Sequence, residues 1–240
     1  MNDSRIIVAL DYAESAKALE FLDQIDATSC RIKVGKELFC RSGPEFVRQL
    51  VKRGFDVFLD LKFHDIPNTV AQACGAAADL GVWMINVHAL GGLKMMEAAR
   101  KALPASAASP LLIAVTILTS LNDEDIQSVG LSGSIAQNVR RLATLASQAG
   151  MDGIVCSAHE LVTVRASMGK DFCLVTPGIR PAGFAPDDQQ RIMTPSQATS
   201  NGADYLVIGR PITMAREPMQ VLTALRSDMK AAHPVPFNAT

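Results

Sequence analysis

The 240-residue sequence has no long uninterrupted apolar run; the longest strand-like one, from Leu111 to Leu118, is interrupted by Thr116. A membrane-spanning helix needs about 20 consecutive apolar residues, so we expect no membrane partner. Charge of one sign is not in excess either, because 23 Lys and Arg residues face 24 Asp and Glu residues. General nucleic-acid binders carry a basic surplus, so we also expect no nucleic-acid partner.

Cysteines are few, and their arrangement is not that of a disulfide framework. The five residues are odd in number, lie far apart and form no C-x-x-C motif, which predicts reduced cysteines in a cytoplasmic protein. The N-terminal residues MNDSRIIVALD lack the basic start and long apolar stretch of a signal peptide, and they predict a first strand instead. With 48% apolar and 20% charged residues, the composition is that of a globular protein.

Several nucleotide and metal motifs are missing from the sequence. Neither G-x-G-x-x-G nor G-x-x-x-x-G-K-[ST] occurs, and the pair His159-Glu160 has no second His for a zinc motif. These absences argue against a dinucleotide-binding fold, a P-loop enzyme and a zinc protease.

Eight short apolar segments recur along the chain, and they are continuous rather than alternating. Such runs are typical of parallel strands that are covered on both faces. The expected strands are Ile6–Leu10, Arg31–Val34, Val57–Leu61, Met84–His88, Leu111–Thr116, Gly153–Cys156, Phe172–Val175 and Tyr205–Ile208.

Helical patterns lie between these segments, and strand–helix alternation predicts βαβ units. Eight units without a linker or a change in composition predict a single-domain α/β protein, a (β/α)8 TIM barrel over residues 1–240. An open doubly wound sheet is the alternative, but it usually has five or six strands and leaves two repeats unexplained. The clearest helical patterns are Glu14–Gln24, Pro44–Lys52, Ile66–Leu80, Leu93–Leu103 and Ser134–Ala149.

Two intervals between strands are longer or more polar than the rest. Ser120–Gly133 follows the fifth strand, and Pro177–Pro195 follows the seventh. Both start at the carboxyl end of a strand, where barrel enzymes carry their active sites, so they are candidate lids. Plain surface insertions are the alternative.

The densest polar signal is the run D-L-K-F-H-D from Asp60 to Asp65, at the end of the third strand. The two-residue period of a strand places Phe58, Asp60 and Lys62 on one face, which we expect to be the barrel interior. Carboxylates beside Lys62 favour its protonated form, which suits a proton donor rather than a Schiff-base nucleophile. Two carboxylates could also hold a divalent metal, but the intervening ammonium argues against it. The alternative is a structural ion pair that closes the barrel end.

Two further charged residues are expected at the same end of the barrel. Lys33 lies in the second strand, and Asp11 ends the first. With Asp60 and Lys62 they form a predicted ring of alternating charge, although Asp11 taken alone also suits a helix N-cap.

An anion site is expected after the last two strands. Gly209 allows close approach of a ligand to the backbone, and Arg210 can bind an oxyanion with two hydrogen bonds. The segment Thr176–Arg180 would form the other wall, and Gln189 can reach in from the long loop. This position after strands seven and eight is the usual phosphate site of the fold.

Six motifs are spread over nearly the whole chain: V-A-L-D at Val8–Asp11, K-V-G at Lys33–Gly35, D-L-K-F-H-D-I-P-N-T at Asp60–Thr69, V-T-I-L-T-S at Val115–Ser120, V-T-P-G-I-R-P at Val175–Pro181 and V-I-G-R-P-I-T at Val207–Thr213. The core D-x-K-x-x-D followed by I-P-N-T is highly specific. In these motifs the chain closely resembles the orotidine 5′-phosphate decarboxylases, and we expect the tail after Ala232 to be dispensable.

The resemblance implies a homodimer that converts orotidine 5′-monophosphate to uridine 5′-monophosphate and carbon dioxide, the last step of UMP synthesis. It implies that Lys62 protonates C6 of the pyrimidine, that Asp60 lies beside the substrate carboxylate and orients Lys62, and that neither a metal nor an organic cofactor is needed. The other implied roles are ribose binding by Asp11 and Lys33, a pyrimidine edge at Thr119 and Ser120, phosphate binding by Arg180, Gln189, Gly209 and Arg210, and a contribution of Asp65, Ile66 and Thr69 to the partner subunit's site.

Two other functions stay open on the sequence alone. A metal-dependent sugar-phosphate decarboxylase or lyase on the same scaffold shares D-x-K-x-x-D but lacks the I-P-N-T continuation. A non-catalytic nucleotide-binding barrel is the second, and the presence of Lys62 and of the long loop argues against it.

Overall fold

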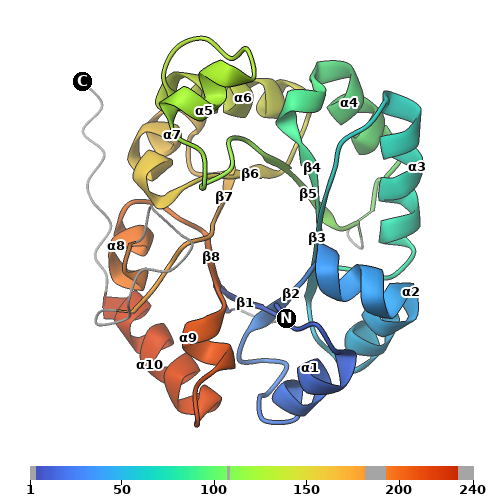
Figure 1. Cartoon of the computed structure of the whole chain (residues 1–240), viewed down its shortest axis with the longest axis vertical. Helices are drawn as coiled ribbons and strands as arrows, with labels where there is room; N and C mark the ends of the chain where they lie inside the picture. The colour runs from blue at the N-terminus through green and yellow to red at the C-terminus, as the bar shows by residue number, and fades with distance from the viewer. Residues whose placement is uncertain (1–3, 107–108, 182–192, 232–240) are drawn as a thin grey trace.

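The chain forms eight parallel strands that close into a barrel, as seen in a computed structural model that describes residues 4–106, 109–181 and 193–231. Neighbouring strands pair in chain order, and the eighth pairs with the first. Helices surround this ring of strands (Figure 1). The predicted (β/α)8 barrel is therefore confirmed. The strands are β1 Ile6–Ala9, β2 Arg31–Gly35, β3 Val57–Phe63, β4 Met84–His88, β5 Leu111–Val115, β6 Gly153–Val155, β7 Cys173–Thr176 and β8 Tyr205–Ile208.

The helices follow the strands in the expected alternation, with short additional helices at several loops. Within the described ranges, no helix is both long and apolar enough to cross a membrane. The α-helices are α1 Ser15–Leu22, α2 Lys36–Lys52, α3 Pro67–Ala78, α4 Leu93–Lys101, α5 Asp123–Ser128, α6 Ile135–Gln148, α7 Leu161–Met168, α8 Pro195–Ser200, α9 Arg210–Thr213 and α10 Pro218–Ala231, and the 3₁₀ turns are η1 Ala89–Gly91 and η2 Ala158–Glu160.

The barrel interior and the layer between strands and helices form two separate apolar clusters. Alternation along β3 illustrates this, because Phe58 packs inside the barrel whereas Leu59 packs outward beneath the helices. At the amino ends of the strands, the guanidinium of Arg31 lies over the ring of Trp83, with centroid distance 4.4 Å, and so closes the interior from below. The interior cluster consists of Ile7, Ala9, Phe58, Met84, Ile113, Val175 and Val207.

Helix α2 begins earlier than the sequence pattern predicts. The expected helix over Pro44–Lys52 is the second of two helical segments, and the first begins at Lys36 directly after β2. The break between them is Gly43, whose φ of 70° and ψ of −174° lie outside the helical region. The first segment was missed because it directly follows Gly35, without a capping side chain to mark its start.

The interval Ser120–Gly133, predicted as a loop, contains helix α5. Asn122 accepts hydrogen bonds from the backbone N–H groups of Glu124 and Asp125, both at 2.9 Å, and the Asp125 carboxylate accepts one from the Asn122 N–H. This is a capping box, and the acidic first turn also suits the positive end of the helix dipole. The sequence N-D-E-D was therefore wrongly interpreted as part of a loop.

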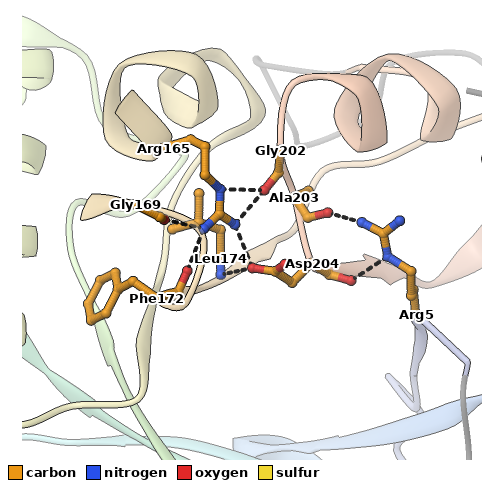
Figure 2. A network of polar contacts seen from close by, with 8 residues as sticks. All are labelled: Arg5, Arg165, Gly169, Phe172, Leu174, Gly202, Ala203 and Asp204. Atoms are coloured by element: carbon orange, nitrogen blue, oxygen red, sulfur yellow. Dashed lines mark hydrogen bonds and ion pairs between the residues drawn. The ribbon is translucent and has the colours of Figure 1, made fainter. Parts of the chain in front are cut away.

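A repeated Gly-x-Asp sequence ties neighbouring strands together at their amino ends. Asp152, before β6, accepts hydrogen bonds from the Leu112 N–H at 2.6 Å and from Arg100 at 2.8 Å. Asp204, before β8, accepts hydrogen bonds from the Leu174 N–H at 2.7 Å and from Arg165 at 2.6 Å (Figure 2). A third copy places Asp56, before β3, 3.3 Å from Nε of the buried Arg31. We call these three Asp–Arg pairs the strand clamps.

Arg165 is the most fully bonded of the clamp arginines, and it is only 7% exposed. Besides the Asp204 carboxylate, its guanidinium donates to the carbonyl oxygens of Gly169, Phe172 and Gly202 at 2.6–3.1 Å (Figure 2). The side chain thus links α7, the start of β7 and the start of β8, and its charge is compensated by an acceptor at each nitrogen.

Replacing this guanidinium with an apolar side chain is expected to destabilise the barrel. Arg165→Met keeps most of the aliphatic stem but leaves three carbonyls and a carboxylate without their donor, so the free energy of unfolding should fall by about 3 kcal/mol. Urea denaturation measures this change. The control Arg48→Met removes an exposed helical pair with Glu45 and should change the value by less than about 1 kcal/mol. Equal effects of the two substitutions would contradict the structural role of Arg165.

Candidate active site

A cavity of about 500 Å³ opens at the carboxyl ends of the strands, where the sequence predicted the site. Its wall is formed by residues on or directly after seven of the eight strands, all but β4. Eight of the predicted site residues line it together: Asp11, Lys33, Asp60, Lys62, Thr119, Arg180, Gly209 and Arg210.

The predicted ring of alternating charge is present in the cavity wall. Nζ of Lys62 donates to Oδ1 of Asp60 at 2.6 Å, while Nζ of Lys33 lies 3.3 Å from Oδ2 of the same carboxylate. The Lys33 ammonium also lies 3.4 Å from Oδ1 of Asp11. The alternative interpretation of Asp11 as a helix cap is wrong, because Glu14 occupies that position of α1.

Asp60 and Lys33 stabilise each other's charged forms. Burial opposes the charge of Asp60, but the nearby ammonium groups of Lys33 and Lys62 hold the pKa of its carboxyl below the usual value. Burial likewise opposes the charge of Lys33, yet the carboxylates of Asp60 and Asp11 raise the pKa of its ammonium. Both side chains are therefore charged at neutral pH.

Lys62 has an unusual backbone conformation. Its φ of 52° makes it the only described non-glycine residue in the left-handed region, a conformation that costs about 1–2 kcal/mol. The pairing of β3 with β4 is interrupted here, since Leu59 pairs with Ile85 but the next pair is Phe63 with Val87. Four steps along β3 thus match two along β4, and the bulge directs the Lys62 side chain into the cavity.

Sequence reasoning missed Asn86, which contacts both members of the Asp60–Lys62 pair. Its Nδ2 donates to Asp60 at 2.7 Å, and its Oδ1 accepts the backbone N–H of Lys62 at 2.8 Å. The side chain is 1% exposed. A signal was available, because Asn86 is a polar residue at an inward position of an apolar strand next to the one that carries Asp60.

The described residues that were predicted to bind an anion line the cavity after β7 and β8. Arg180 is 8% exposed, and its backbone N–H donates to the carbonyl of Met193 at 3.0 Å, which ties the two ends of the long loop together. Gly209 and Arg210 line the cavity after the adjacent strand β8, and Pro211 falls in the first turn of α9, as expected. Gln189 lies outside the described residues. The wall thus supplies two guanidinium groups suited to an oxyanion.

Other predicted site residues do not line this cavity. Ser120 is exposed beyond its edge, although the neighbouring Thr119 lines it. Asp65, Ile66 and Thr69 are also exposed, and the Asp65 carboxylate accepts the N–H of Ile66 at 2.7 Å. The carboxylate that pairs with Lys62 in the described chain is thus Asp60, not Asp65.

Two histidines lie beside the site. The rings of His64 and His88 stack with centroids 5.4 Å apart, and Nδ1 of His88 accepts the N–H of Leu90 at 3.4 Å. Burial, with the nearby charges of His64 and Lys62, lowers the pKa of His88 to about 4. His88 is therefore neutral at physiological pH and adds no charge to the cavity.

The described residues contain no cluster of metal ligands, and the cysteine in the cavity wall is not a reactive thiol. No group of three or more His, Cys, Asp or Glu side chains is arranged to hold a metal ion there. All five cysteines are free. Cys156 lines the cavity, and burial raises the pKa of its thiol well above the usual value, so it packs as an apolar group.

Comparison with known proteins gives consistent matches over most of the chain. The model of the "Orotidine 5′-phosphate decarboxylase / HUMPS family" matches residues 4–225. The chain is 57% identical to the orotidine 5′-phosphate decarboxylase of Nitrosococcus oceani over 229 residues, covering 95% of this chain and 99% of that one. It is 58% identical to the enzyme of that name from Vibrio cholerae over 230 residues, covering 95% and 100%.

Solved structures give the same result. The crystal structure of orotidine 5′-phosphate decarboxylase from Lactobacillus acidophilus superposes with a TM-score of 0.86 at 37% sequence identity, covering 95% of this chain and all of that one. An uncharacterised conserved protein from Geobacillus kaustophilus superposes with a TM-score of 0.82, also at 37% identity, covering 93% and 99%. Both similarities cover more than nine tenths of this chain.

Proposed function

Because the chain belongs to the orotidine 5′-phosphate decarboxylase / HUMPS family, we propose that it converts orotidine 5′-monophosphate to uridine 5′-monophosphate and carbon dioxide. The observation that carries the proposal is the Lys62 ammonium, hydrogen-bonded to Asp60 at 2.6 Å, in the wall of a cavity that also contains Arg180 and Arg210. An ammonium group and an oxyanion site in one cavity suit a phosphorylated substrate whose carboxylate charge passes to a ring carbon during the reaction.

The chemistry follows from the loss of carbon dioxide. When the bond between C6 and the carboxylate breaks, its electron pair stays on C6, and the resulting carbanion needs a nearby cation and a proton. In the proposed mechanism, the Lys62 ammonium supplies the stabilising charge and then transfers a proton to C6. Asp60 fixes the position of that ammonium and faces the substrate carboxylate. One side chain thereby does the work for which other decarboxylases use an organic electron sink, so we propose a cofactor-independent reaction.

The remaining cavity residues are assigned to binding. We propose that Asp11 and Lys33 bind the ribose hydroxyls and that Thr119, with Ser120, borders the pyrimidine. The phosphate would be held by Arg180, Gln189, Gly209 and Arg210. β1 and β2 separate β8 from β3 in the barrel, so the phosphate site and Lys62 lie at different parts of the rim. Binding energy from the phosphate can therefore serve to order the reacting end.

We further propose a homodimer in which each subunit completes its partner's site. The run from His64 to Thr69 is exposed, and within it Ile66 is 67% exposed, a large apolar side chain at the start of α3. Leu90 is another large apolar side chain, 41% exposed. It lies near the same segment, as shown by the close approach of its neighbour Gly91 to the His64 ring. An exposed apolar side chain next to a carboxylate that does not line its own cavity supports a role of Asp65, Ile66 and Thr69 across a subunit interface.

A cytoplasmic location is part of the proposal. It is supported by the five free cysteines, three of them buried and none paired, which suit a reducing compartment.

Lys62→Ala tests the proposed reaction. The purified wild-type enzyme should release carbon dioxide from orotidine 5′-monophosphate with unchanged rate in the presence of a metal chelator. Lys62→Ala should lower the turnover number by at least about a hundredfold, because both the cation and the proton are lost, while circular dichroism shows an intact fold. More than a tenth of wild-type turnover in the variant would contradict the role of Lys62. Loss of wild-type activity with chelator would favour a metal-dependent reaction on the same scaffold.

Subunit mixing tests the shared site. Lys62→Ala and Asp65→Ala proteins are each expected to be inactive, but a hybrid dimer has one site with both defects and one intact site. Co-refolding equal amounts should therefore restore about a quarter of wild-type activity, since half of the dimers are hybrids with one working site each. The matched control mixes Lys62→Ala with Asp60→Ala, which should restore none because both residues belong to the same site. Equal results from the two mixtures would contradict the shared site.

Arg210→Ala tests the phosphate site by comparing two substrates. A charge-assisted hydrogen bond contributes about 1.5–3 kcal/mol, so kcat/KM for orotidine 5′-monophosphate should fall by at least about tenfold. Orotidine without its phosphate should be affected far less, because the guanidinium has no oxyanion to bind. Arg48→Ala, on an exposed helix face, serves as the control. Equal losses on both substrates would mean that Arg210 stabilises the barrel rather than the phosphate.

A further inference from the structure

Asn86 lies on β4 inside the barrel and makes two hydrogen bonds to β3. Its Nδ2 donates to Oδ1 of Asp60 at 2.7 Å, the same oxygen that accepts the Lys62 ammonium at 2.6 Å. Its Oδ1 accepts the backbone N–H of Lys62 at 2.8 Å. With only 1% of the residue exposed, these bonds are shielded from water, which makes them stronger than surface contacts.

The two bonds fix the orientation of the amide. A flipped amide would point its NH₂ group at the Lys62 N–H and its oxygen at the Asp60 carboxylate, and both contacts would be repulsive. The arrangement therefore determines two things at once: which oxygen of Asp60 receives two donors, and where the strained backbone of Lys62 lies.

The break in strand pairing explains why such a residue is needed. Between Leu59 and Phe63, β3 has no regular register with β4, so the Lys62 N–H has no partner in the strand ladder and bonds to a side chain instead. Lys62 also has a φ of 52°, and such a conformation persists only where surrounding contacts hold it. Asn86 supplies the contact on the β4 side.

We propose that Asn86 is a positioning residue for the reaction, which holds the Asp60 carboxylate and the Lys62 backbone so that the Lys62 ammonium reaches the substrate carbon. The inference rests on the proposed function of Lys62 as proton donor. Asn86 does not line the cavity, so it acts through its two neighbours rather than on the substrate.

The first test is a double-mutant cycle in turnover. Asn86→Leu, close in size but without polar atoms, should lower kcat by about a hundredfold, the effect of misplacing a reacting group by about 1 Å. The dissociation constant of uridine 5′-monophosphate should stay within about threefold, because the phosphate site is untouched. In a Lys62→Ala background, Asn86→Leu should cause no further loss of residual activity. A wild-type kcat in Asn86→Leu, or the same loss in both backgrounds, would overturn the proposal.

Asn86→Asp provides a second readout and an isosteric variant, in case Asn86→Leu does not fold. The new carboxylate can still accept the Lys62 N–H but faces Asp60. The charged groups around Asp60 are Lys33 and Lys62, with Asp11 beyond Lys33, and the titratable but neutral His88 lies further along β4. Two facing carboxylates share a proton as the pH falls, which restores a donor toward Asp60.

The kcat of Asn86→Asp relative to wild type should therefore rise as the pH is lowered from 8 to 5.5, whereas a purely structural role gives a constant ratio and would overturn the proposal. His88 is present in both proteins, so its titration cancels in the ratio. A wild-type enzyme inactive on orotidine 5′-monophosphate would instead refute the proposed function itself, which distinguishes the two failures.

Discussion

A carboxylate inside a protein must be compensated, and the Asp60 carboxylate in the mouth of this barrel determines the arrangement around it. It has two ammonium groups within 3.3 Å and one amide donor at 2.7 Å. Lys33 comes from β2, Asn86 from β4, and Lys62 from the end of β3, the strand that also carries Asp60. Removing any one leaves a buried charge with less compensation than it needs, which is why the side chains around the mouth are interdependent.

The same strand geometry produces this polar ring and the apolar core beneath it. Inward side chains on parallel strands stack in layers, so Phe58 and Asp60 occupy successive layers of one strand face. The apolar layer below keeps water out of the barrel interior, and a lower effective dielectric strengthens the ion pairs above it. The apolar packing and the charged ring at this end of the barrel therefore both result from the alternation of inward and outward side chains along the strands.

The sequence predicted those features that depend on local periodicity. All eight strands appear within a few residues of their expected positions, and the inward placement of Asp60 follows from a two-residue period. Lys62 also faces the cavity as predicted, but it does so from a bulge with a φ of 52° and not from a regular strand. Asn86 was missed because its importance depends on which residues face it across a strand pair, and the bulge in β3 that creates this contact leaves no signature in the local pattern. Helix α5 was missed for a different reason, since its capping residues also favour turns.

The strand clamps lie at the opposite end of the barrel from the cavity, and this separation has a consequence for how the protein tolerates change. Asp56, Asp152 and Asp204 bind their arginines at the amino ends of β3, β6 and β8, whereas the cavity is built from residues at and beyond the carboxyl ends of the strands. The residues that hold the strands together at their amino ends are thus different from the residues that line the cavity. Rim residues that do not contact Asp60 can therefore change while the foot of the barrel keeps the fold intact, which gives this scaffold room to acquire other substrate preferences.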